Sequence, residues 1–173
     1  VSISSAYWPL VWPAPEVATL ELMEGKLILP VRETATGSET SFPPPESAEP
    51  WVVETLRKPD HARRTKIDHV TGEITLIIED DFGCVRDLNH GLETGSIARE
   101  RWTIRPDDPL SARGWTHWTQ TSKRGEWETR TETFSTMRSD KEAFILSARI
   151  EAYEGEEMMF ERDFEEQVTR ENL

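Results

Sequence analysis

Apolar and polar residues alternate along much of the second half of the chain. The alternation is clearest near the C-terminus, where one face would carry Phe144, Leu146, Ala148, Ile150 and Ala152. After Glu154-Gly155 the next segment continues the pattern with Met158, Phe160 and Phe164. Because side chains of a strand point alternately to opposite faces, this pattern predicts a β-hairpin with one buried face.

Similar segments separated by turn residues occur from Trp51 onward. We expect strands at about 51–57, 63–70, 73–80, 83–88, 96–105, 112–122, 126–137, 142–153 and 157–165. Glycine accepts the positive φ of tight turns, so we place turns at Thr71-Gly72, Phe82-Gly83, Arg124-Gly125 and Glu154-Gly155. The Arg105–Pro109 stretch reads as a proline-bracketed turn. A helix is conceivable only at 164–172, where a cap and an apolar stripe are missing.

The chain divides into three parts by composition. Residues 1–34 hold two proline turns and two short apolar runs, 17–23 and 26–31, separated by Glu24-Gly25 like a hairpin. Residues 35–50 are rich in Gly, Ser and Pro and predict a linker or strap. Residues 51–173 form the β-rich remainder. We therefore predict an all-β protein, with an antiparallel β-sandwich segment continuing into an antiparallel meander or partly closed barrel.

Composition and charge narrow the possible partners. With 173 residues, 36% of them hydrophobic, the chain can form one ordinary core. A formal net charge of -13 repels nucleic acid and anionic lipid surfaces. Cys84 is the only cysteine, which excludes an intrachain disulfide, and no apolar run approaches the roughly 18 residues of a membrane span. A cytoplasmic location is the default expectation.

The sequence holds no recognisable catalytic set. It lacks the G-x-S-x-G elbow of serine hydrolases, and the four histidines have no zinc-motif spacing. Glu79-Asp80-Asp81 offers oxygen ligands for calcium but not the alternating loop of a calcium site. Cys84 reads as a small strand residue. We therefore predict no catalytic residue, no metal and no cofactor.

Aromatic clusters are the remaining candidates for a binding or interface role. Tyr7, Trp8 and Trp12 lie on a proline-broken backbone near the start, where they could pack over a domain interface or stack on a sugar. Interface packing is the more frequent use of such anchors. Trp115 and Trp118 differ by three residues and so should face opposite sides of their strand.

Several stretches also resemble the C-terminal part of the cocaine esterase and X-prolyl dipeptidyl-peptidase hydrolases, the CocE/NonD family. They cover nearly the whole chain: Ser4–Pro15, Leu27–Arg32, Pro43–Glu46, Asp68–Glu73, Asp87–Gly95, Ile104–Arg113, Glu151–Gly155 and Phe160–Asp163. The resemblance implies a parent enzyme with an α/β-hydrolase domain, a helical cap and a C-terminal jelly-roll sandwich. None of the catalytic motifs has a counterpart here.

Residues and resemblance together predict a non-catalytic accessory region of a serine hydrolase. It would pack on an upstream α/β-hydrolase domain of the same chain and shape substrate access or oligomer contacts, including a homo-oligomer. The start at Val1, inside a strand-like stretch, fits a fragment or processed product. The alternative is a stand-alone β-sandwich or barrel module that binds carbohydrate or an apolar small molecule.

Overall fold

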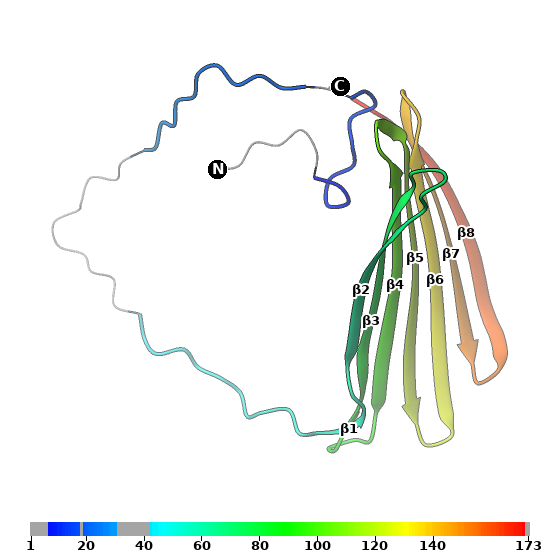
Figure 1. Cartoon of the computed structure of the whole chain (residues 1–173). Helices are drawn as coiled ribbons and strands as arrows, with labels where there is room; N and C mark the ends of the chain where they lie inside the picture. The colour runs from blue at the N-terminus through cyan, green and yellow to red at the C-terminus, as the bar shows by residue number, and fades with distance from the viewer. Residues whose placement is uncertain (1–6, 18, 31–41, 172–173) are drawn as a thin grey trace.

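The computed structural model describes residues 7–17, 19–30 and 42–171, and its regular structure is one open antiparallel sheet (Figure 1). The eight strands are β1 (Val53–Arg57), β2 (Asp60–Ile67), β3 (Ile74–Asp87), β4 (Glu93–Arg105), β5 (Asp108–Arg124), β6 (Trp127–Ser139), β7 (Ala143–Glu154) and β8 (Glu157–Thr169). The described residues contain no helix. The prediction of an all-β, antiparallel fold is confirmed.

Each strand from β3 to β8 pairs with the next one along the chain, in the order β3-β4-β5-β6-β7-β8. The strands β1 and β2 both pair with β3, β2 along Ile74–Asp81 and β1 along Cys84–Asp87. One edge of the sheet is therefore made of two short strands end to end, and the other edge is β8. The meander needs only tight turns. Gly91, Gly125 and Gly155 adopt positive φ at three of them, Asp107 has φ 57° in the Arg105–Pro109 turn, and the turn at 140–142 contains no glycine.

Gly83 lies in a bulge inside β3, so the turn predicted at Phe82-Gly83 is wrong. Pairing with β4 shifts between Asp81 and Cys84, at the point where β3 changes partner from β2 to β1. Gly83 has φ 84°, and a Cβ there would lie 2.7 Å from the carbonyl oxygen of Arg57. Only glycine accommodates both the positive φ and this close backbone approach.

The pairing register sorts the side chains onto two faces. Opposite residues share a face, so the row Leu76, Trp102, Gly114, Met137, Leu146 and Glu166 lies on one side. We call this side the apolar face; it also carries Ile78, Ala98, Trp118, Phe144, Ala148, Ile150, Phe160 and Phe164. The opposite side, the charged face, carries Arg99, Arg101, His117, Glu132, Arg149, Glu151, Glu161 and Asp163.

Burial is slight for a sheet with such a face. Among the described residues, the hydrophobic residues that are buried are three alanines, Ala98, Ala112 and Ala143, and no large side chain is fully buried. Trp115 and Trp118 do point to opposite faces, as predicted, and both are half-buried. The apolar face is therefore formed but not covered by a second layer of regular structure.

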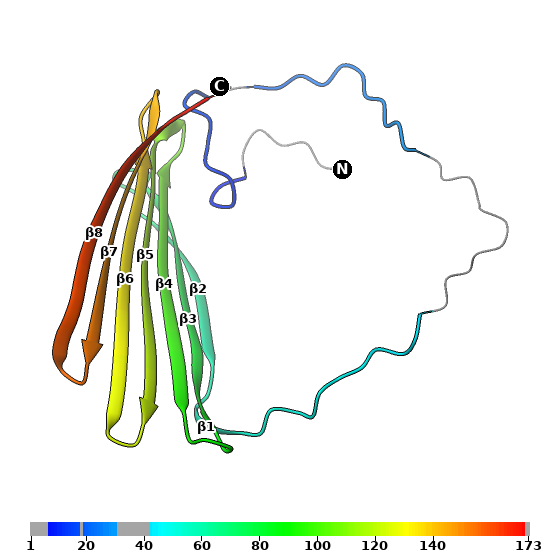
Figure 2. The same cartoon turned by 180° about the vertical axis from the view of Figure 1, so that it is seen from behind.

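The first part of the chain differs from the prediction. Residues 7–17, which we call the arm, lie against one end of the sheet. Residues 19–30 run away from it, and residues 42–52 approach it and lead into β1 (Figures 1 and 2). The described residues of the apolar runs predicted at 17–23 and 26–31 form no strand. Their side chains are exposed, among them Leu22 and Ile28, and no strand edge lies beside them to satisfy the backbone.

The bulge predicts an unequal cost for two glycine substitutions. Gly83→Ala and Gly125→Ala both place alanine at positive φ, but a Cβ at Gly125 meets nothing within 4 Å. We expect Gly125→Ala to lower the free energy of unfolding by about 1 kcal/mol, and Gly83→Ala by about 2–3 kcal/mol. Urea unfolding of both variants measures the difference; equal losses would contradict the bulge geometry.

Candidate functional site

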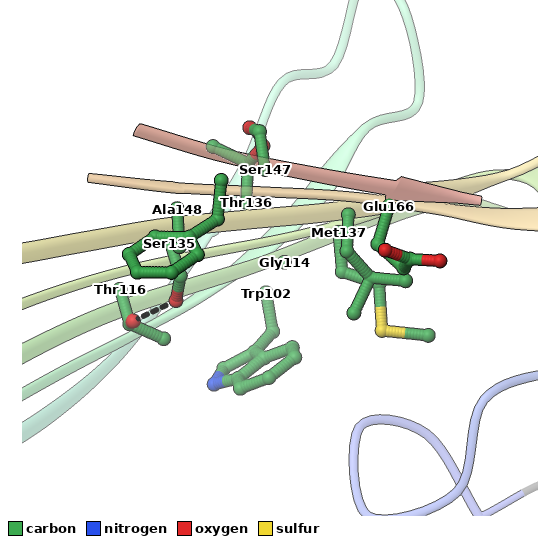
Figure 3. A pocket seen from close by; sticks show the side chains of 11 residues that line it. Trp102, Gly114, Thr116, Ser135, Thr136, Met137, Ser147, Ala148 and Glu166 are labelled. Carbon is green, nitrogen blue, oxygen red and sulfur yellow. Dashed lines mark hydrogen bonds between the residues drawn. The ribbon is translucent and has the colours of Figure 1, made fainter. Parts of the chain in front are cut away.

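A hollow of about 260 Å³ lies on the apolar face across β4 to β8. Its walls come from neighbouring strands, with Trp102 on β4, Met137 on β6, Leu146 and Ala148 on β7 and Phe164 on β8. Thr116 and Ser135 join their hydroxyls at 2.6 Å at one side (Figure 3), so these two polar groups satisfy each other. The hollow thus offers mainly carbon surface.

Trp102 and Gly114 shape this hollow together. The two residues are cross-strand partners, and a Cβ on Gly114 would lie 2.6 Å from the Trp102 ring. The missing side chain lets the indole lie across the backbone of β5, while the indole Nε1 donates to Glu100 Oε2 at 2.8 Å. With its polar atom satisfied at the side, Trp102 presents its ring to the hollow.

The arm already covers one end of the apolar face with aromatic rings. Trp8 contacts Trp102 edge-on, with ring centroids 6.0 Å apart, and Trp12 contacts Phe144 edge-on at 6.4 Å. Trp8 and Trp12 also contact each other at 5.1 Å, and Trp12 Nε1 donates to Ser139 Oγ at 2.8 Å. The sequence singled out Tyr7, Trp8 and Trp12; the two tryptophans pack on the sheet, and Tyr7 is 45% exposed.

Arg170, near the C-terminus, holds the arm against the sheet. It follows β8, is only 8% exposed, and donates from Nη2 to the carbonyl oxygen of Pro13 at 2.7 Å. Its Nη1 donates to Ser139 Oγ and to the carbonyl oxygen of Asp140, while the guanidinium lies over the Phe144 ring at 4.7 Å. One buried cation therefore joins the arm, the turn after β6, and the end of β8.

The charged face is held by pairs and stacks between neighbouring strands. Arg149 on β7 bonds Glu161 on β8 and also Glu151 on its own strand, at 2.7 Å, while the Arg130 guanidinium on β6 lies 4.0 Å from the centre of the Tyr153 ring on β7. Phe134 stacks on His117 with centroids 4.4 Å apart. The polar side chains named here therefore find partners within the charged face, as expected for the solvated side of a sheet.

Glu132 is the most connected carboxylate of this face. Burial by itself raises its pKa, but donors at Thr119, Arg130 and His117 together hold the pKa below its ordinary value. The His117 Nε2 lies 2.6 Å from Glu132 Oε2. Within the described part of the chain, no serine or cysteine side chain hydrogen-bonds this pair, and we interpret the cluster as a structural cross-strand network.

A second carboxylate with several hydrogen-bond partners, Asp87, is the last residue of β3. It accepts from Trp51 Nε1 and from the backbone N–H of Asn89, and it lies 3.1 Å from His90 Nε2. The Trp51 bond, followed by the Asn89 N–H and the charge of His90, lowers the pKa of Asp87 although burial opposes the shift. Trp51 thereby fixes the entry of the chain into the sheet.

The acidic residues considered as calcium ligands pair with arginines instead. Asp80 points to the apolar face and binds Arg63 at 3.0 Å, whereas Glu79 and Asp81 point to the charged face and bind Arg64 and Arg57 at 2.9 and 2.8 Å. Within the described part of the chain, no three His, Cys, Asp or Glu residues gather as metal ligands. Cys84 lies half-buried in β3, opposite Gly95.

Sequence reasoning missed two parts of this site. Leu146 and Phe164 were on the predicted apolar alternation, but nothing in the sequence marked Trp102 as their neighbour across three strands. The Arg170 contacts to the arm span 157 residues and carry no local signal.

Fold and site together define an all-β protein made of one open antiparallel sheet, with an apolar face that bears a hollow. Comparison with known family models, with curated proteins and with solved structures finds no match for this chain. Among the described residues, no helix has the length and apolar character needed to span a bilayer.

The Arg170 contacts predict that the arm loosens when this cation is removed. Arg170→Met should speed exchange of the Trp12 indole N–H with solvent by at least about tenfold, because a loss of roughly 1.4 kcal/mol shifts an equilibrium that far. The matched control is Arg162→Met, since Arg162 also lies 4.7 Å over a ring, Phe164, but is far from the arm's contacts. Nuclear magnetic resonance follows the indole signal. Unchanged exchange in Arg170→Met would refute the fastening role.

The lowered pKa of Asp87 predicts a pH-dependent contribution to stability. Its folded pKa lies below the unfolded value of about 3.9, so its stabilisation is fully present above that pH and is lost as pH falls toward the folded pKa. Asp87→Asn should therefore unfold at lower urea than the native chain at pH 7. The gap should shrink as the pH drops below about 4. A gap independent of pH would show that the carboxylate charge is unimportant.

Proposed function

We propose that this chain is a non-catalytic accessory region of a serine hydrolase of the cocaine esterase and X-prolyl dipeptidyl-peptidase type. It packs on the hydrolase domain and shapes substrate access or oligomer contacts. The family assignment rests on the stretches named above, such as Asp87–Gly95 and Ile104–Arg113.

The observation that carries an accessory role is the uncovered single sheet. A compact monomer of 19.9 kDa exposes roughly 8,700 Å², whereas this chain exposes 14014 Å². The exposed side chains of the described segments 19–30 and 42–52 contribute to the excess, and so do the half-buried side chains of the sheet. Sheets of this kind are stable in proteins when a second layer covers their apolar side. A chain with this surface is suited to pack against another domain.

Stand-alone binding of an apolar small molecule is the second candidate, and the hollow at Trp102 favours it. Ligand pockets usually enclose about 300–1,000 Å³ and surround most of the ligand. This hollow holds about 260 Å³ and is open along the sheet. It fits one inserted side chain better than a whole ligand, which ranks the accessory role first.

The accessory role predicts that the isolated chain does not turn over hydrolase substrates. Purified chain is incubated with p-nitrophenyl acetate and with an X-Pro p-nitroanilide. We expect rates equal to those of the Cys84→Ser variant and of buffer, because Cys84 is the one thiol that could react with the ester without a catalytic set. Sustained turnover of either substrate by the purified chain would contradict the proposal.

A further inference from the structure

We propose that a second hollow, on the apolar face at the end of the sheet away from the arm, is a binding site for a neutral saccharide. The hollow holds about 360 Å³ and lies over β3, β4 and β5, beside the residues that lead into β1. We call it the bulge hollow, because Gly83 of the β3 bulge lines it. This site is additional to the accessory role and does not depend on it.

The bulge in β3 places an aromatic ring at this end of the sheet. Pairing with β4 shifts between Asp81 and Cys84, so β3 has one more residue than β4 across the bulge. Phe82 lies in this segment and stacks on Trp118 of β5, with ring centroids 5.8 Å apart and ring planes 21° apart. Phe82 is still 47% exposed, so part of its ring surface is open to a ligand.

Trp51 forms the second aromatic wall of the bulge hollow. Its indole Nε1 donates to Asp87, and the residue is 62% exposed. Because its one polar atom already has a partner, Trp51 offers the hollow mainly the carbon surface of its ring. Trp8 and Trp12, which the sequence suggested as sugar-stacking rings, pack on the sheet instead.

The floor of the bulge hollow is polar but uncharged. The cross-strand pairs Ser96–Gln120 and Thr94–Ser122 lie on the same side of the sheet as Trp102, because an even number of residues separates them from it along the strand. Within the described part of the chain, these four side chains have no hydrogen-bond partner, and each is half-buried or exposed. Their hydroxyl and amide groups are therefore available to a ligand.

Aromatic walls and an uncharged polar floor together select the class of ligand. A sugar ring carries C–H groups on one side, which stack on the negatively polarised face of an aromatic ring, and hydroxyls at its rim, which bond Ser, Thr and Gln side chains. None of the described residues that line the bulge hollow is ionisable, so an acidic sugar, a phosphate or a nucleic acid would find no counter-charge there. A lipid or an apolar side chain would leave the hydroxyl and amide groups of the floor without hydrogen-bond partners.

The dimensions of the site favour an oligosaccharide over a single sugar. Ligand sites usually enclose about 300–1,000 Å³, and the bulge hollow, with about 360 Å³, lies within that range. Neutral hydroxyls continue onto β6, where Thr131 is opposite Gln120 and Thr129 is opposite Ser122. A chain of sugar rings can therefore extend from the aromatic walls across the neighbouring strands.

The test is a nuclear magnetic resonance titration of the full 173-residue chain. The probes are maltopentaose, cellopentaose, mannopentaose and xylopentaose, each added to about 5 mM, which detects dissociation constants near 1 mM. We expect at least one of them to shift the indole N–H signals of Trp51 and Trp118 in a saturable way. The signal of Trp115, on the charged face, should stay in place.

Two pairs of matched variants locate the site. Gln120→Ala and Phe82→Leu should each weaken binding of the active probe at least about fivefold, the effect of losing one hydrogen bond or one stacked ring. The controls are Gln167→Ala, an exposed glutamine on the charged face of β8, and Phe160→Leu, a phenylalanine that is 50% exposed on the apolar face of β8. Both controls should leave the affinity unchanged. Gln120 is exposed and has no side-chain partner among the described residues, so its loss should not unfold the chain.

Three outcomes would overturn the saccharide site. The first is the absence of a saturable shift with all four probes. The second is binding that survives both Gln120→Ala and Phe82→Leu, which would place the ligand elsewhere on the chain. The third is equally strong binding of trigalacturonate, an acidic sugar, which would contradict the selection of a neutral ligand by an uncharged hollow.

Discussion

The structure depends on one constraint, the alternation of side chains across an antiparallel sheet whose register is fixed strand by strand. Because β3 to β8 follow each other through tight turns, a single register places Trp102, Leu146 and Phe164 on one side. A slip of one residue would send all of them to the charged face. The alternation of side chains therefore places a large apolar surface on one face of the sheet. A single layer cannot bury that surface.

The two faces stabilise the sheet in different ways. On the charged face, ion pairs and ring stacks such as Arg149 with Glu161 and His117 with Phe134 connect neighbouring strands. On the apolar face, burial is the larger source of stability, at about 25 cal/mol for each Å² of apolar surface covered. Apolar surface is buried at one end of this face, where the arm and Arg170 cover Phe144, but it stays exposed around the hollow at Trp102.

Much of the fold could be predicted from the sequence, because the relevant signals are local. Period-two alternation marked β7 and β8, and glycines marked the turns at Gly72, Gly125 and Gly155. The bulge at Gly83 was mistaken for a turn, since positive φ serves both and the change of partner strand has no local signature. The arm's docking was also beyond prediction, because Trp12 meets Ser139 and Pro13 meets Arg170 across more than a hundred residues. The division into residues 1–34, 35–50 and 51–173 stays a prediction.

The heat capacity change of unfolding tests the central claim, that the isolated chain leaves its apolar face in water. It scales with the apolar surface that becomes exposed on unfolding, and ordinary domains give about 12–15 cal/mol/K per residue. Differential scanning calorimetry of the chain at neutral pH should give a value clearly below that range, because little apolar surface is buried to begin with. A value within the range would mean that the face is covered in solution, and it would contradict the account.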